Sequence, residues 1–190
     1  MNTAADHLAR LINNRLGAAF PRGPAEARGD ARHPFVVRRA HLLEFISFLR
    51  NDRDADLSLL IDITGVDRGG PVLGDDKHRR FEVWYQLRSP RLGYRAHIAV
   101  PIAEDDAVVP SLTPLFRAAE TLERELFEMF GIYPDGHPQL LPYLLYKGFV
   151  GHPLRKDYRA GKQQPLVPLL DDVAQPVIID ADIAGEGGAA

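Results

Sequence analysis

The residues of this chain that are best suited to chemistry lie in the segment 123–158. An acidic and basic triplet, Glu123-Arg124-Glu125, comes first, and two Gly-His-Pro turns follow at Gly136-His137-Pro138 and Gly151-His152-Pro153. The second turn continues into Leu154-Arg155-Lys156-Asp157-Tyr158. Paired carboxylates can divide into a general acid and a general base, and imidazole nitrogens are common zinc ligands. The segment therefore raises three possibilities: an acid–base pair, a metal site and an anion-binding loop.

The acid–base possibility depends on Glu123, Glu125 and His137. Consecutive positions of a helix point about 100° apart, so the two carboxylates of the triplet face different surroundings. We expect a solvated or subunit-interface face here, with an i, i+4 ion pair between Arg124 and Glu128. A stand-alone hydrolase or lyase that uses Glu123, Glu125 and His137 is kept as an alternative.

The metal and anion possibilities have weaker support. His137 and His152 alone do not complete a zinc site, and the other histidines lack a His-Glu-x-x-His spacing. Because proline favours an extended residue before it and glycine permits a turn, we expect each imidazole to be fixed over a backbone or carboxylate partner. The 151–158 run lacks the Gly-x-x-x-x-Gly-Lys-Ser/Thr pattern of a phosphate loop, so Arg155 and Lys156 are predicted to pair with Glu125 or with a partner protein.

Composition narrows the class of protein. The 190 residues suit one well-buried domain, and the net charge of −3 gives no electrostatic case for nucleic acid. The sequence contains no cysteine, which removes the thiolate ligands of iron–sulfur clusters and of most structural zinc sites. Neither a secretory signal nor a membrane span is evident, so we expect a soluble, cytoplasmic chain.

Hydrophobic periodicity predicts the elements that position these residues. Helices are expected at 4–18, at 40–49 and from Ser111 or Thr113, as the cap, to Phe130, with Gly131 ending the last one. Strands are expected at 35–37, 57–64, 80–88 and 94–100, with Pro101 ending the fourth. The segments 21–30 and 68–78 are interpreted as connections.

This order of elements predicts an α+β fold, a small mixed or antiparallel sheet with helices packed on one face, followed by an extended irregular C-terminal tail. We place the α+β domain at residues 1–133 and a partner-binding tail at residues 134–190. Prolines break any long helix after Arg159, and the apolar residues there have no periodic partner. We therefore expect the last part of the tail to become ordered on another subunit.

The triplet, the helix-ending Gly131 and the two Gly-His-Pro turns together resemble the C subunit of the proton-pumping NADH:quinone oxidoreductase, the 30 kDa subunit family of respiratory complex I. The family pattern is E-R-E, two residues, D-(L/M)-(F/Y)-G-I, then G-H-P, L-R-R with a hydrophobic residue, and G-H-P-L-R-K-D-(Y/F). This chain has Glu128 at the usual aspartate, and Leu140-Leu141-Pro142-Tyr143 at the usual L-R-R run.

The resemblance implies a cofactor-free accessory subunit of the peripheral arm, on the cytoplasmic face of the inner membrane. It implies docking on the large quinone-site subunit and the iron–sulfur subunits, with FMN and the clusters held by partners, and no catalytic activity of the isolated chain. No catalytic, cofactor or metal residue is assigned. Structural or interface roles are implied for Glu123, Arg124, Glu125, Gly131, Gly136, His137, Pro138, Gly151, His152, Pro153, Arg155, Lys156 and Asp157.

Two other functions fit the same pattern. A membrane-bound energy-converting hydrogenase or a formate-linked complex uses a related subunit, and a general scaffolding module also fits the tail. Because Arg155 follows the predicted core, we expect Arg155→Ala to weaken assembly and leave the domain folded.

Overall fold

The computed structural model describes Leu8, residues 10–12, 34–69 and 80–159, Gly161 and Gln164. The elements in these ranges, in chain order, are β1 (Phe35–Val36), the 3-10 helix η1 (Arg39–His41), α2 (Leu42–Asn51), β2 (Leu59–Asp67), β3 (Phe81–Arg88), β4 (Arg95–Ile102), β5 (Val108–Pro110), α3 (Ala119–Phe130) and β6 (Tyr133–Asp135). The helix predicted over 4–18 lies mostly outside the described residues, although residues 10–12 are helical.

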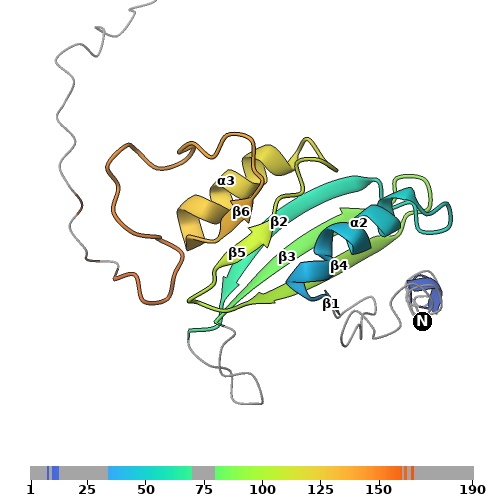
Figure 1. The fold of residues 1–190 in the computed structure, drawn as a ribbon, viewed down its shortest axis with the longest axis horizontal. Helices are drawn as coiled ribbons and strands as arrows, with labels where there is room; N and C mark the ends of the chain where they lie inside the picture. The colour runs from blue at the N-terminus through green and yellow to red at the C-terminus, as the bar shows by residue number, and fades with distance from the viewer. Residues whose placement is uncertain are drawn as a thin grey trace, which may run out of the picture.

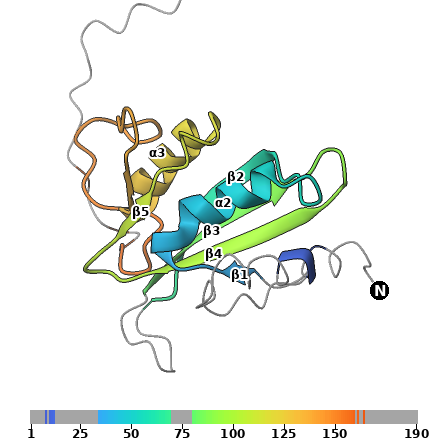
Figure 2. The same ribbon diagram turned by 45° about the vertical axis from the view of Figure 1, so that its right-hand side comes forward.

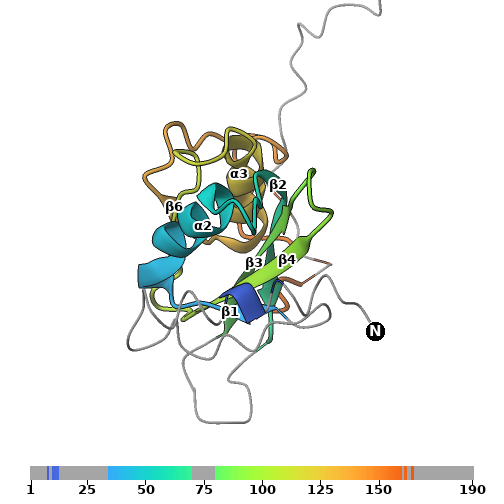
Figure 3. The same ribbon diagram turned by 90° about the vertical axis from the view of Figure 1, so that its right-hand side faces the viewer.

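The main sheet has four strands in the order β1-β4-β3-β2. Strands β2, β3 and β4 pair antiparallel, whereas β1 runs parallel to β4, so the sheet is mixed. Both helices lie on one side of it (Figures 1 and 3). A second, two-stranded parallel sheet of β5 and β6 lies beside α3 (Figure 1). The predicted α+β class, mixed sheet and one-sided helices are confirmed.

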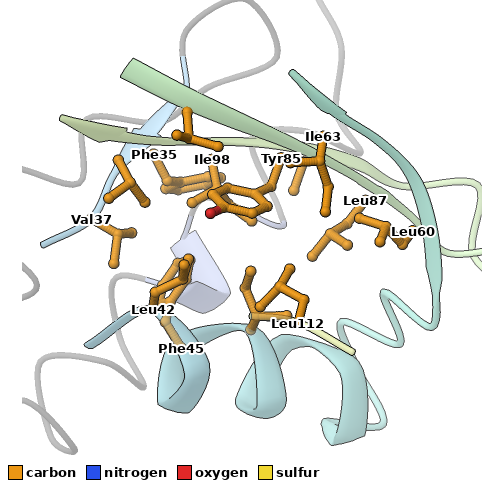
Figure 4. Packing of buried hydrophobic residues seen from close by; sticks show 14 of the residues in the cluster. Phe35, Val37, Leu42, Phe45, Leu60, Ile63, Tyr85, Leu87, Ile98 and Leu112 are labelled. Carbon is orange, nitrogen blue, oxygen red and sulfur yellow. The ribbon is translucent and has the colours of Figure 1, made fainter. Parts of the chain in front are cut away.

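The core lies between the sheet and α2. The spacing of apolar residues in the sequence accounts for its position. The apolar stripe of α2 (Leu42, Phe45, Ile46 and Leu49) is fully buried, as its helical spacing predicts. Alternate residues of β3 (Phe81, Val83, Tyr85 and Leu87) point to the same face. Figure 4 shows Tyr85 in the middle of this cluster, between the sheet and the helix.

Helix α3 reaches the sheet because β2 carries a glycine beneath it. A Cβ atom added to Gly65 would lie 2.6 Å from the ring of Phe130, so only glycine leaves room for that ring. The helix buries Ala119, Leu126 and Phe130 against the core, and Gly131 ends it in the left-handed conformation, at φ 68°. The predicted helix end is therefore confirmed.

Two predictions about boundaries are wrong, and one pair of strands was missed. Strand β4 runs through Pro101, which pairs with Glu82, because β1 ends before this point and requires no N–H from proline there. Helix α3 begins at Ala119 and has no side-chain cap, since residues 112–116 form a separate turn. The parallel pair β5 and β6 was not predicted, because three-residue strands carry too little pattern.

After β6, residues 136–159 contain neither helix nor strand, in agreement with the predicted irregular segment. They run back along α3 in both views of the molecule (Figures 1 and 2). We refer to residues 136–158 as the capping loop, for the contacts described next. The part of the predicted tail (134–190) from residue 165 onward lies outside the described residues.

Candidate functional site

The second Gly-His-Pro turn closes the C-terminal end of α3. The last four carbonyl groups of a helix have no partner inside it. Here each accepts a hydrogen bond: Phe127 from the N–H of Gly131 (2.8 Å), Glu128 from Nδ1 of His152 (2.9 Å), Met129 from the N–H of Leu154 (3.1 Å) and Phe130 from Nε of Arg155 (2.5 Å). Three of these donors belong to the Gly-His-Pro-Leu-Arg run, so its first role is to cap the helix.

Gly131 makes this approach possible. Its φ of 68° is the left-handed region that favours glycine, and an added Cβ would lie 2.5 Å from the guanidinium of Arg155 and closer still to Nε2 of His152. The imidazole of His152 also packs edge-on against Phe127, with ring centroids 6.4 Å apart. The imidazole of His152 can therefore lie this close to the end of the helix because residue 131 is a glycine.

The first Gly-His-Pro turn binds the other end of the same helix. His137 donates from Nε2 to the carbonyl of Glu120 (2.9 Å) and accepts at Nδ1 from the N–H of Gln139 (3.1 Å). One neutral tautomer makes both bonds. Arg124 adds a bond from Nε to the carbonyl of Gln139 (3.1 Å). The expectation that each imidazole is fixed over a backbone or carboxylate partner is confirmed for both histidines, and in each case the partner is a backbone carbonyl.

Between the two turns, the side chain of Glu128 binds backbone N–H groups of the capping loop. The side chain is buried, with 7% of the residue exposed, and its carboxylate accepts N–H groups from Tyr143 (2.9 Å), Leu144 (2.8 Å) and Leu145 (3.3 Å). Three backbone donors on one carboxylate form strong, charge-assisted bonds. The predicted Arg124–Glu128 ion pair is wrong, since Arg124 pairs with Glu120 at 3.1 Å.

The end of the capping loop is fastened to the sheet through Asp67 and Arg80. Asp67, at the end of β2, accepts from Arg80 Nη2 (2.9 Å) and from the N–H groups of Gly69 (2.7 Å) and Lys156 (2.8 Å). Burial opposes ionisation of Asp67, yet these donors lower the pKa of its carboxyl to about 2. Arg80 also binds Asp157 (2.8 Å) and Glu104, and its hydrogen bonds to Asp67 and to these two acids raise its pKa.

Glu123 lies on the opposite, buried side of α3. Only 1% of the residue is exposed, and its carboxylate accepts from Ser111 Oγ and from the N–H of Leu112, both at 2.6 Å. Burial raises the pKa of Glu123, against the lowering effect of these bonds and of His137. Burial, together with the nearby Glu123, raises the pKa of the Tyr85 phenol, whose hydroxyl has no hydrogen-bond partner among the described residues.

The structure does not form the acid–base site considered from the sequence. Glu125 is exposed, whereas Glu123 faces the core, as expected for helix positions two residues apart, which point about 200° from each other. Neither Arg155 nor Lys156 pairs with Glu125 in the part of the chain that the structure describes, so the Glu125 alternative is wrong, whereas pairing with a partner protein stays a prediction. Arg155 instead stacks over the ring of Phe81, with its guanidinium carbon 5.0 Å from the centroid.

Sequence reasoning missed Asp67, Arg80 and Ser111 as partners of the motif. Asp67 and Arg80 stand on both sides of the 68–78 connection, a strand-end placement that suggests a pair but does not indicate its third member, Asp157. Ser111 was interpreted as a helix cap, and its hydroxyl binds Glu123 instead. These partners are remote in sequence and meet only in the folded chain.

Among the residues that the structure describes, no group of three His, Asp or Glu side chains could hold a metal ion, and no helix is long and apolar enough to cross a membrane. A pocket of about 720 Å³ is lined by Gly151, His152, Arg155, Asp157, Tyr158, Arg159 and Gly161. A second, of about 660 Å³, is lined by Asn51, Asp52, Arg53, Asp54, Asp56 and Arg91.

The outer side of the capping loop is apolar. Its polar atoms bind α3 and the sheet, whereas Leu141, Tyr143, Leu144, Tyr146, Val150 and Leu154 each expose at least 41% of their surface. Exposed apolar side chains concentrated in one segment are typical of protein–protein contacts. The site as a whole is therefore an irregular loop, joined by hydrogen bonds to α3 and the sheet, with an apolar exterior.

Comparison with known proteins agrees with this description. Residues 35–164 match the family model described as the respiratory-chain NADH dehydrogenase 30 kDa subunit. The C subunit of the NADH-quinone oxidoreductase of Brucella ovis is 40% identical over 155 residues, which cover 82% of this chain and 72% of the relative. The C subunit from Caulobacter vibrioides is 42% identical over 123 residues, 65% of this chain and 59% of that protein.

Solved structures show the same fold. A trypsin-resistant fragment of Nqo5 superposes with a TM-score of 0.55 at 29% identity, covering 70% of this chain and 98% of the fragment. A chain of an archaeal membrane-bound sulfane sulfur reductase superposes with a TM-score of 0.63 at 23% identity, covering 82% of this chain and 85% of that one, a likeness of fold alone. By sequence and by fold, this chain belongs to the respiratory-chain NADH dehydrogenase 30 kDa subunit family.

Proposed function

We propose that this chain is a cofactor-free accessory subunit in the peripheral arm of a proton-pumping NADH:quinone oxidoreductase. In this role it docks on the large quinone-site subunit and on neighbouring iron–sulfur subunits, at the cytoplasmic face of the inner membrane. FMN and the clusters belong to those partners, and the isolated chain has no turnover of its own. Its contribution is to support assembly of the electron-transfer chain.

The proposal rests on a difference between the two sides of the capping loop: the motif side chains bind α3 and the sheet, and the apolar side chains are exposed. The histidines, Arg155 and Asp157 of the motif bind carbonyl groups of α3 or Arg80 of the sheet. A catalytic histidine or acid has to be available to substrate, and these side chains are occupied by structural bonds. The loop offers its apolar residues to the outside instead, which favours docking over catalysis.

A preformed loop suits an assembly role for an energetic reason. Ordering a segment during binding costs conformational entropy, which reduces the affinity that the contacts provide. Hydrogen bonds to α3, Glu128 and Asp67 hold residues 136–158 within the chain itself. The free chain can therefore present its apolar surface without a large ordering cost.

Purification of the tagged chain from its native membranes in mild detergent tests the proposal. We expect flavin- and cluster-bearing subunits to co-purify with NADH:quinone activity, and Leu144→Ser to reduce their recovery. Leu43→Ser is the matched control, because Leu43 is exposed on α2, away from the loop. Nickel-bearing partners with hydrogenase activity would select the related hydrogenase or formate-linked complex, and a lone chain with turnover would overturn both assignments.

A further inference from the structure

The pocket beside the second Gly-His-Pro turn carries more positive charge than its own acids neutralise. It holds two guanidinium groups, Arg155 and Arg159, and one carboxylate, Asp157. Asp157 is already engaged, because its two oxygens lie 2.8 Å and 3.1 Å from Arg80. That hydrogen bond from Arg80 lowers the pKa of Asp157, and the positive charge of Arg155 lowers it further, so this acid is ionised and its contacts are with Arg80.

Neither pocket arginine has a carboxylate of its own among the described residues. Arg155 donates from Nε to the neutral carbonyl of Phe130 and lies over the ring of Phe81. Arg159 is exposed at the rim. Within the ranges that the structure describes, neither guanidinium forms an ion pair, so both retain N–H donors at the lining of the pocket.

The pocket is also built to keep its shape. His152 on its wall is fixed by the carbonyl of Glu128, and Tyr158 is stacked on Phe149 with the ring planes 19° apart. Leu154 and Val150, each about half exposed, belong to the same loop. Arginine and tyrosine within an apolar surround are the composition of protein-interface hot spots.

From this arrangement we infer that the pocket receives an acidic side chain, Asp or Glu, from a neighbouring subunit, with Arg159 as its principal ionic partner. The inference rests on the proposed function, since it requires an assembled complex. A carboxylate matches the two-donor fork of a guanidinium, and partial exclusion of water by the apolar surround strengthens the pair. The contact would fix the orientation of docking, whereas the exposed leucines and tyrosines supply apolar area.

Charge reversal at the rim gives the first test. Arg159→Glu should lower the affinity for the partner subunits by about tenfold, roughly 1.4 kcal/mol, and should leave the melting temperature of the isolated chain unchanged. Arg95→Glu is the matched control, because Arg95 is exposed at the far end of β4 and stands opposite Arg88. Equal losses from both variants would mean a general effect of charge and would overturn the inference, as would no loss from Arg159→Glu.

A zero-length crosslink gives the second test. In the purified complex of the Arg159→Lys variant, a carbodiimide should join the new amine to a partner carboxylate as an amide, with loss of water. Mass spectrometry then identifies the partner residue, and Arg95→Lys should give no such product. Recovery of the Arg159→Lys complex without a crosslink at position 159 would overturn the pocket assignment alone, whereas failure of wild type to bring down any subunit would overturn the proposed function.

Two other anions can be distinguished by their own probes. Inorganic phosphate and vesicles of anionic phospholipid are titrated against the isolated chain and its Arg159→Glu variant. No binding at millimolar phosphate supports a protein carboxylate as the occupant. Saturable binding that Arg159→Glu abolishes would assign the pocket to a phosphate group and overturn the inference.

Discussion

The imidazole of His152 stands against the last turn of α3, with Nδ1 2.9 Å from the carbonyl oxygen of Glu128. The same glutamate turns its carboxylate to the backbone of Tyr143, Leu144 and Leu145. One residue at the helix end therefore binds the loop twice, by its carbonyl and by its side chain. This double contact explains why the capping loop keeps a defined path without helix or strand.

Arg155→Ala should destabilise the isolated chain, contrary to the expectation drawn from its position after the predicted core. The substitution removes the donor to the Phe130 carbonyl and the stacking on Phe81, at a cost of about 1–3 kcal/mol. Urea unfolding measures the loss, and Lys147→Ala, an exposed change in the same loop, should cost less than about 0.5 kcal/mol. Equal unfolding midpoints for the two variants would refute the capping role.

Gly131→Ala and Gly136→Ala form a matched pair. Both glycines have positive φ, 68° and 83°, so alanine strains the backbone at either position. Only at Gly131 would the new methyl also collide with the imidazole of His152, whereas nothing lies within 4 Å at Gly136. We expect Gly136→Ala to cost about 1 kcal/mol and Gly131→Ala clearly more. Thermal melts compare the two, and the reverse order would contradict the close contact.

Acid should unfold this chain partly through Asp67. Its folded pKa of about 2 lies below the ordinary 3.8, so the stabilisation is present above pH 4 and is lost as the pH falls from about 4 to 2. The shift corresponds to about 2 kcal/mol. Asp67→Asn should therefore lower the unfolding free energy at pH 6 and flatten its fall below pH 4.

Asp105→Asn serves as the control for that experiment, because Asp105 is exposed in the turn after β4. Urea midpoints are recorded at a series of pH values for wild type and both variants. If the fall in urea midpoint below pH 4 is as steep in Asp67→Asn as in wild type, the Asp67 network is not its source.

The titration of Glu123 should change the stability of the chain with pH in the direction opposite to that of Asp67. Burial raises its folded pKa above the ordinary 4.5, so its contribution is fully present below about pH 4.5 and declines as the pH rises through the folded pKa. Glu123→Gln keeps an acceptor for Leu112 and removes the titration. The variant should therefore compare more favourably with wild type at pH 7 than at pH 4, in the same urea experiment; a constant difference would contradict the buried, desolvated carboxyl.

Glu128→Ala should loosen one part of the capping loop and spare another. The amides of Tyr143, Leu144 and Leu145 lose their acceptor, whereas the Leu154 amide keeps the Met129 carbonyl. Hydrogen exchange read by NMR should show tenfold or faster exchange at 143–145, about 1.4 kcal/mol of lost protection, with Leu154 little changed. Uniform acceleration of all four would indicate general unfolding instead of a local hold.

The sequence alone determined the secondary framework and the family. Period-two alternation in 80–88, the apolar stripe of α2 and Gly131 at a helix end are local patterns, so the strand, the helix and the stop were predictable from neighbouring residues. The paired Gly-His-Pro turns were specific enough to indicate the family. Their preference for a backbone partner followed from glycine and proline chemistry.

Only the tertiary structure decided what the motif binds. Arg155 was expected to reach a carboxylate and instead caps Phe130, and Asp67 meets Lys156 although they are 89 positions apart in the chain. Such pairs depend on how α3 packs over Gly65 and where the loop returns to the sheet, which no local pattern encodes. Short-range preferences fix local conformation, whereas the partner of a charged side chain is chosen by the packing that buries it.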